Sequence, residues 1–480
     1  AMHTFAIRQC GLLPEAAEWT DAFLSLELAR LQCHVLAAPA SSSRFTYFWG
    51  LGADKMHAHY EAPPTVRSIG MGYADFREKV TRRCPAPGAA SSDGEALYLQ
   101  TGLAQRSPSG EMQNAAGVGP ELQRMLAKLR EAADVGGAQA PDPAGGNGAA
   151  SNAGPATTTL GKEAMAAALD RNAGQEGARR DAPRSSVDAA VALIRGLVSE
   201  GRMGRYSRTA FFASSVGAIT RLHFDHYDNL YLQLRGRKRF VILAPLEARG
   251  LYAFPLHHPL DQRARVHIDA VEQAAAHAAG DHDPAHVASQ AAAYQAAYPR
   301  LGDVRGFEII LEPGDMLYIP HHWWHHVETI GGDEGVDGLS LSLNLWFDFE
   351  PRLVSPPLPL TQGLLLELAR HVEQWIGSLL GEKAIPDFLE SCALELSMAD
   401  AELGASGARA RVTADEANAV TLPRQWLVAR NLLFCELATS YVGWGELRAF
   451  FDELLSAGRY RGLVAVEPEM GASPRAESSK

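Results

Sequence analysis

Two short motifs in the middle of the chain carry residue types that bind a redox-active metal. His223 and Asp225 stand two residues apart, and four histidines follow about 100 residues later, at His321, His322, His325 and His326. Two histidines and one carboxylate form the ligand set that holds non-haem Fe(II) on one face of an octahedron, leaving three positions open for a co-substrate and O₂. These residue types therefore indicate iron-dependent oxidation.

The elements around the motifs must bring distant residues together. Alternate side chains of a strand share one face of a sheet, so His223 and Asp225 are expected side by side. The second motif, at 313–326, lies too far along the chain for local geometry. Two strands of one barrel would close that distance.

The second motif also carries two tryptophans beside its histidines. Pro-Gly-Asp at 313–315 precedes a short apolar run, and Trp323 and Trp324 supply the dry wall that a reactive iron centre needs. Alternation pairs His325 with Trp323 and His326 with Trp324. By itself, it leaves open which of the two pairs faces the metal.

The middle of the chain predicts antiparallel strands joined by short turns. Apolar or alternating runs of strand length occur at 208–215, 230–234, 239–243, 307–311, 316–320 and 340–347. The expected fold class is mainly β with flanking helices. Its centre is a double-stranded β-helix, or jelly roll, across 186–350, with an Ala/His-rich insertion at 270–290. Residues 1–103, mixed α/β, are expected to complete this barrel.

Two further regions differ from the barrel in composition or period. Residues 104–185 are rich in Ala and Gly, with too little apolar surface to offset the entropy of ordering, so a largely disordered insertion with a helix near 120–133 is expected. It is either a plain loop expansion or a docking segment. From 359 to 463 the apolar period becomes 3.6, which predicts helices, and 464–480 is predicted to be a disordered tail. The helical stripes either pack on the barrel or form a homodimer.

Composition and charge argue against several classes of protein. The 480 residues are 46% hydrophobic and 21% charged, as in ordinary globular proteins. A net charge of −12 argues against a general affinity for nucleic acid. No apolar run approaches the ~18 residues of a membrane span. The five cysteines are scattered and the first residues do not resemble a secretion signal, so a reducing compartment, cytoplasm or nucleus, is expected.

In combination, the motifs resemble the JmjC group of Fe(II)- and 2-oxoglutarate-dependent dioxygenases, whose barrel is of the cupin type. The resemblance rests on His223 to Asp225, Lys238, Pro313-Gly314-Asp315 and Trp323-Trp324-His325-His326. Within that group the chain is most similar to the asparaginyl hydroxylases of the kind called factor inhibiting hypoxia-inducible factor. This finer likeness adds Leu97–Gln100, Gly236–Arg239, His257–Pro259 and Asn344–Trp346.

The resemblance implies roles for individual residues. The implied metal ligands and catalytic residues are His223, Asp225 and His325. The residues implied to bind 2-oxoglutarate are Lys238, Thr220, Tyr98, Asn229 and Asn344. Those implied to touch a peptide substrate are Gln100, Trp324, Gln262 and Arg263. The last two stand in the reverse of the family's Arg-Gln order, a departure that bears on substrate preference.

The function implied by the resemblance is hydroxylation of a protein side chain, asparagine or a related residue at its β-carbon, with Fe(II), 2-oxoglutarate and O₂. A protein or peptide substrate is then the expected partner. Alternatives within the group are lysine demethylation and hydroxylation of a tRNA base. An alternative of another class is a cupin-like binding protein without catalysis, and the intact ligand set argues against it.

Overall fold

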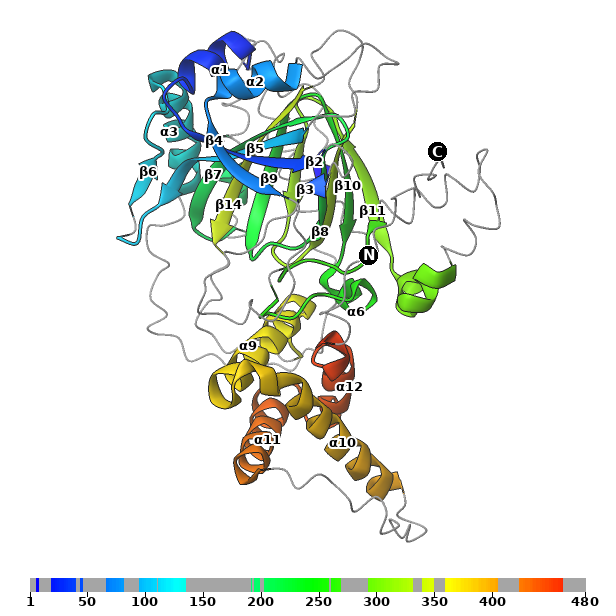
Figure 1. The fold of residues 1–480 in the computed structure, drawn as a ribbon. Coiled ribbons are helices and arrows are strands. Elements are labelled where there is room, and N and C mark those ends of the chain that lie inside the picture. The colour runs from blue at the N-terminus through cyan, green and yellow to red at the C-terminus, as the bar shows by residue number, and fades with distance from the viewer. Residues whose placement is uncertain are drawn as a thin grey trace, which may run out of the picture.

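Two facing antiparallel sheets form the centre of the molecule (Figure 1). One contains, in spatial order, β12 (Met316–Ile319), β9 (Tyr227–Arg235), β14 (Leu339–Asp348) and β7 (Tyr206–Ser215). The other contains β11 (Gly306–Leu311), β10 (Arg237–Leu243), β13 (Trp324–Ile330) and β8 (Ile219–His223). The chain passes repeatedly between the two sheets, which is the topology of a jelly roll. The predicted fold class, mainly β with flanking helices, is confirmed.

The structure is a computed structural model. It describes residues 6–7, 19–39, 44–45, 66–81, 95–109, 111–134, 191, 194–198, 203–258, 260–268, 292–330, 339–348, 359–404 and 423–460. The Ala/His-rich stretch 270–290, the tail 464–480 and most of the predicted insertion 104–185 lie outside these residues. Among the described residues, no helix combines the length and apolar character that a membrane crossing requires.

N-terminal strands widen the first sheet. Next to β7 lie β5 (Glu95–Arg106), β2 (Cys33–Pro39) and β4 (Arg67–Met71), while β6 (Met112–Asn114) pairs with β5. Short strands complete the edges, β1 (Ala6–Ile7) beside β12 and β3 (Arg44–Phe45) beside β8. Strand β5 continues past the boundary expected at 103 because its far end pairs with β6 and β7. Within the expected insertion 104–185, the structure therefore contains the end of β5 and β6 in addition to the helix expected near 120–133.

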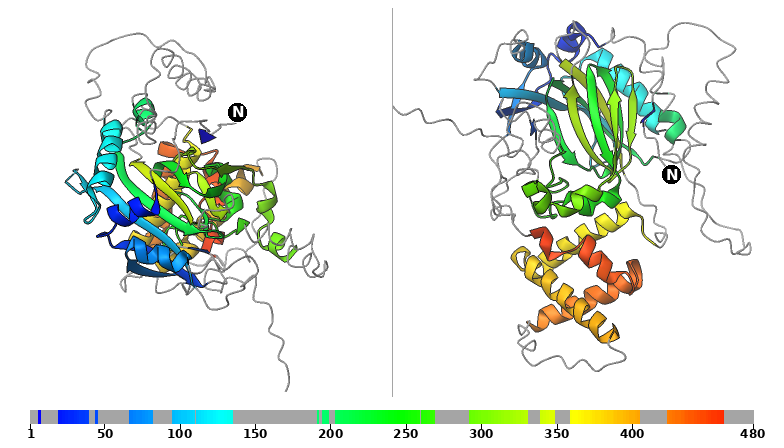
Figure 2. Two further views of the ribbon diagram at one scale, coloured as in Figure 1. Left: turned by 90° about the horizontal axis from the view of Figure 1, so that it is seen from above. Right: turned by 90° about the vertical axis from the view of Figure 1, so that its right-hand side faces the viewer.

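Helices cover the outer face of the large sheet. These are α1 (Asp21–Glu27), α2 (Tyr73–Thr81) and α3 (Pro120–Asp134) (Figure 2). Leu24, Phe76 and Leu126 from the helices pack in one core with strand residues such as Leu343. Because β14 is covered on both faces, all its residues from 339 to 347 are buried, polar ones included. Alternation then directs its Asn344 into the barrel.

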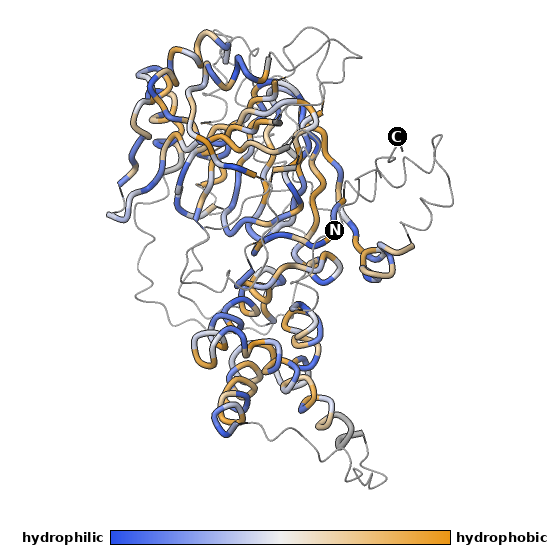
Figure 3. Tube along the Cα trace, viewed as in Figure 1, coloured by the Kyte–Doolittle hydropathy of each residue, from blue (hydrophilic) through white to orange (hydrophobic). Residues whose placement is uncertain are grey.

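The C-terminal helices form a separate layer beneath the barrel (Figure 2). They are α9 (Gln362–Leu380), α10 (Ile385–Gly404), α11 (Arg424–Glu436) and α12 (Leu447–Glu453), and they share a core of their own. Figure 3 shows hydrophobic stretches both on the central strands and along these helices. Leu366 of α9 packs into the core beneath β8 and β13, and the fully buried Glu373 accepts a hydrogen bond of 3.0 Å from the backbone of Leu256.

Candidate metal centre

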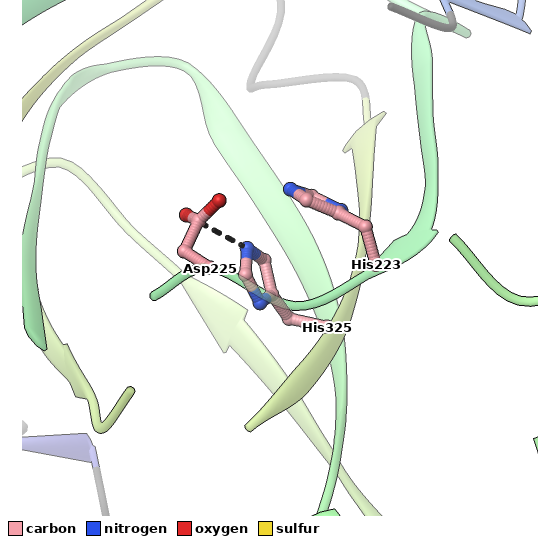
Figure 4. Close-up of side chains that lie close together, drawn as sticks. All are labelled: His223, Asp225 and His325. Atoms are coloured by element: carbon pink, nitrogen blue, oxygen red, sulfur yellow. Dashed lines mark ion pairs between the residues drawn. The ribbon is translucent and has the colours of Figure 1, made fainter. Parts of the chain in front are cut away.

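Strand pairing brings the two motifs of the sequence together. His223 at the end of β8 is directly opposite His325 on β13, and their ring centroids are 4.1 Å apart. Asp225 follows β8, and its Oδ2 lies 3.8 Å from Nε2 of His325 (Figure 4). One ligand atom from each of the three side chains lies within 4.8 Å of the others. The sheet therefore gathers two imidazoles and one carboxylate at one point.

Backbone carbonyls fix the orientation of both imidazoles. Nδ1 of His223 lies 2.8 Å from the carbonyl oxygen of Arg221, and Nδ1 of His325 lies 3.1 Å from that of Trp323. A carbonyl oxygen only accepts, so each Nδ1 carries a hydrogen and each Nε2 keeps its lone pair. Metal-binding histidines commonly donate their second ring nitrogen in this way. The donor set fits a cation such as Fe(II).

The protonation states of the three groups suit metal binding as well. Burial, and then the nearby His325 and Arg263, lowers the pKa of His223 well below its ordinary value, and burial lowers the pKa of His325. Burial alone would raise the pKa of Asp225, but the two imidazoles and Arg263 outweigh it and hold that pKa low. Neutral imidazoles beside an ionised carboxylate are the state that a divalent cation requires.

Inside the barrel, Lys238 of β10 is only 1% exposed. Its ammonium lies 5.3 Å from the ring centroid of Tyr98 and 6.0 Å from that of Tyr231. Among the described residues it has no anionic partner, and burial lowers its pKa to about 7. A buried ammonium without a counter-ion is disfavoured, so a carboxylate ligand fits this position.

Polar groups line the same interior. The hydroxyls of Tyr98 and Thr220 are hydrogen bonded to each other, and burial raises the pKa of Tyr98 to about 12. Oδ1 of Asn229 and Oδ1 of Asn344 are buried without a hydrogen-bond partner in the described part of the chain. Native proteins rarely leave such atoms unsatisfied. The residues predicted to hold 2-oxoglutarate thus share one interior, and its unsatisfied groups fit a polar ligand.

The residues predicted to touch a peptide differ in their position and burial. The backbone of Arg263 forms an antiparallel β-bridge with that of His223, and the charge of Arg263 lowers the pKa of Asp225, so this residue lies at the metal centre. Its neighbour Gln262 is nearly buried and has a positive φ of 67°. Gln100, on β5, is half-buried and pairs with Phe212 of β7.

Trp324 lies in a packed core. The tryptophan is 0% exposed and packs edge to face on Phe224, with ring centroids 4.9 Å apart, in the core shared with Leu366. Alternation along β13 sends Trp324 to the face opposite His325, so it does not border the metal centre. In this structure its side chain packs in the core, whereas the sequence predicted a contact with the substrate.

Two further residues of the site were not predicted from the sequence. The guanidinium of Arg208, on β7, lies 4.7 Å from the ring of Tyr227 and 4.6 Å from that of Trp346, and its charge helps to lower the pKa of Asp225. Tyr231 lies beside Lys238 and donates a hydrogen bond of 2.6 Å to Ser342. The sequence could have predicted that Tyr231 faces the interior, because it stands two residues after Asn229 and alternate residues of a strand share a face.

Comparison with known proteins agrees with this architecture. Residues 160–352 match the family model of the cupin-like domain. Lysine-specific demethylase JMJ32 of Arabidopsis thaliana is 28% identical over 142 residues, which are 28% of this chain and 39% of that protein. Jumonji C domain-containing protein 5 of Drosophila melanogaster is 29% identical over 132 residues, 28% of this chain and 25% of that protein.

A human relative has a name that describes a reaction. The bifunctional peptidase and (3S)-lysyl hydroxylase JMJD7 of Homo sapiens is 27% identical over 147 residues, 29% of this chain and 41% of that protein. In all three relatives the match spans less than half of the protein. These similarities support the cupin-like domain, and they do not single out the asparaginyl hydroxylases.

Proposed function

Because the chain carries a cupin-like domain of the JmjC type, we propose that it is an Fe(II)- and 2-oxoglutarate-dependent oxygenase that hydroxylates a side chain of a protein. The observation that carries the proposal is the triad of His223, Asp225 and His325, whose ligand atoms lie within 4.8 Å of one another. The buried Lys238 adds a second support, because a dicarboxylate co-substrate needs a cation at its far end.

In this proposal each group of residues has a separate task. When bound, the metal supplies the oxidising chemistry in which 2-oxoglutarate and O₂ become succinate and CO₂ and one oxygen atom enters a C–H bond. Lys238 binds the distal carboxylate, assisted by the hydroxyls of Tyr98 and Thr220. The amides of Asn229 and Asn344 orient the chelating end, and the aromatic interior excludes water.

For the target residue, we propose asparagine or a related side chain oxidised at its β-carbon. The half-buried Gln100, and the guanidinium of Arg263 whose charge acts on Asp225, are the groups that would recognise a polar side chain beside the metal. Lysine is the second candidate, because two relatives bear the names of a lysine-specific demethylase and a lysyl hydroxylase. The net charge of −12 disfavours a tRNA substrate.

Succinate formation tests the reaction class. The full chain, loaded anaerobically with Fe(II), should release succinate from 2-oxoglutarate once O₂ is admitted, and Asp225→Ala should abolish the release. Asp303→Ala, which changes an exposed aspartate outside the barrel strands, is the matched control and should retain the release of succinate. Equal turnover by the two variants would refute the triad. Peptide pools analysed by mass spectrometry then separate hydroxylation, a gain of one oxygen, from loss of a methyl group.

We further propose that the C-terminal helices mediate a homodimer. Trp375 and Leu379 of α9, and Val428 and Leu432 of α11, are 38%, 54%, 52% and 60% exposed. Large apolar side chains exposed on the surface commonly mark an interface. Light scattering during gel filtration should give twice the chain mass, and Leu432→Lys should halve it.

The buried thiols of Cys33 and Cys392, neither of which forms a disulfide, support a reducing compartment such as cytoplasm or nucleus.

A further inference from the structure

A second group of metal-binding side chains connects the barrel to the C-terminal helices. His226 lies between β8 and β9, His322 lies between β12 and β13, and Glu367 is on α9. One ligand atom from each lies within 4.8 Å of the other two. None of the three side chains is part of the triad around Asp225, so this is a separate cluster.

The three atoms form a triangle of the size that a metal ion requires. Oε1 of Glu367 lies 3.1 Å from Nδ1 of His226 and 3.1 Å from Nε2 of His322, and the two nitrogens are 3.4 Å apart. A cation about 2.1 Å from each atom, the usual length of a zinc bond to nitrogen or oxygen, would lie roughly 1 Å above this triangle. The angles between its bonds would be about 95° to 108°, between octahedral and tetrahedral values.

The surrounding structure holds the imidazoles in place. The ring of Phe224 packs against His226 and His322, with centroids 5.5 and 5.7 Å away. His322 has a φ of 63°, a left-handed conformation that residues other than glycine seldom adopt and that clusters at functional sites. A Cβ at Gly363, in the first turn of α9, would lie 3.0 Å from Nδ1 of His322, so glycine lets the helix approach this closely.

Charge around the cluster favours a cation. Nε of Arg370 lies 3.1 Å from Oε1 of Glu367, and Asp261 pairs with another nitrogen of the same guanidinium. Two carboxylates and one guanidinium leave a net negative charge beside two imidazoles. This ion pair with Arg370 also helps to hold the carboxylate of Glu367 in place. The side chains of Glu367 and His226 are 20% and 31% exposed, which leaves the cluster accessible from solvent.

We propose that His226, His322 and Glu367 bind one divalent transition-metal ion of the zinc class. Two imidazoles and one carboxylate suit such a cation. The ion joins two loops of the barrel to α9 and fixes the C-terminal helices on the barrel. It is additional to the iron of the triad and takes no part in the oxidation.

The same short contacts could also be hydrogen bonds that need no metal. Without a metal, both imidazole N–H groups would donate to the carboxylate of Glu367, and the cluster would be a hydrogen-bonded link between barrel and helix. That account predicts no second metal equivalent and no stabilisation by zinc. The two accounts are therefore separable by metal content and by thermal stability.

Metal stoichiometry tests the proposal on the full chain. Protein stripped with EDTA is loaded with Zn²⁺, desalted and analysed by mass spectrometry of the metal. Wild type should retain two zinc ions per chain, and His223→Ala/Asp225→Ala should retain one. Adding Glu367→Gln or His226→Ala to that double variant should remove the remaining ion. His371→Ala, whose side chain is 71% exposed one turn from Glu367, is the matched control and should keep it.

Thermal unfolding measurements distinguish a lost metal site from a variant that fails to fold. Zn²⁺ should raise the Tm of His223→Ala/Asp225→Ala and leave that of its Glu367→Gln derivative unchanged, since a ligand that binds only the folded state stabilises it. An absence of bound zinc in folded His223→Ala/Asp225→Ala would overturn the proposal. So would a zinc ion that stays bound when Glu367→Gln, and likewise when His226→Ala, is added to that double variant, because other side chains would then be its ligands. These outcomes do not depend on whether the chain is an oxygenase.

Discussion

His223 and His325 occupy directly opposite positions on β8 and β13, with imidazole centroids 4.1 Å apart. In each ring Nδ1 is hydrogen bonded to the backbone carbonyl of the residue two positions earlier, so both rings present Nε2 toward the same point. The strand register, rather than a flexible loop, therefore sets the spacing of two ligands. A site built on rigid strands keeps its geometry before a metal arrives.

The last two histidines of the second motif, His325 and His326, should behave differently. His325→Ala should abolish the visible charge-transfer band of the anaerobic Fe(II)–2-oxoglutarate complex, because it removes a ligand. His326→Gln should retain the band, because alternation along β13 directs position 326 to the other face. Both residues are buried, so each variant is first checked for folding by circular dichroism. A band that is lost in both folded variants, or in neither, would contradict this assignment.

Binding of 2-oxoglutarate should weaken as the pH rises through neutrality. Burial lowers the pKa of Lys238 to about 7, so above that pH a proton must be taken up before the ammonium can bind a carboxylate. The affinity should be full below pH 7 and fall by up to about tenfold per unit above it. Calorimetry between pH 6 and 9 measures this slope. Lys238→Arg stays charged throughout, and an identical slope in that variant would exclude Lys238 as the cause.

The same lysine should reduce the stability of the protein without its co-substrate. Between pH 7 and 10.5 the unfolded chain holds a proton on this side chain that the folded chain does not, so wild-type stability should rise with pH across that window. Lys238→Met should stabilise the protein at pH 7 by a few kcal/mol, since each unit of pKa shift is worth about 1.4 kcal/mol. Urea titrations of both proteins provide the measurement. A destabilised Met variant would mean that the ammonium is well solvated or paired.

Trp324 should matter for stability and not for substrate choice. Replacing this fully buried side chain with alanine should cost about 3–5 kcal/mol of the free energy of unfolding, as for large aromatic residues in other cores. Trp324→Phe should lose less and leave the ratio of kcat/KM for two peptide substrates unchanged. If the Phe variant kept its stability but altered that ratio, the tryptophan would have to contact the substrate after all.

The sequence by itself determined the barrel and the type of its chemistry. Alternating apolar runs predicted the positions of most central strands, because a strand between two covered faces needs apolar side chains at short, regular intervals. The spacing of His223 and Asp225 predicted that they share a face. Turn residues such as Gly236, which has a φ of 69°, marked where the strands reverse. These features are local, so a single sequence contains them.

Only the tertiary structure decided which face each residue joins. The register of β13 against β8 selects His325 over His326 and buries Trp324, because a shift of one residue would exchange the two faces. The cluster of His226, His322 and Glu367 exists only because α9 docks beneath the barrel, which brings together side chains from three distant segments. No local pattern encodes that docking, since it depends on how complete apolar surfaces fit each other.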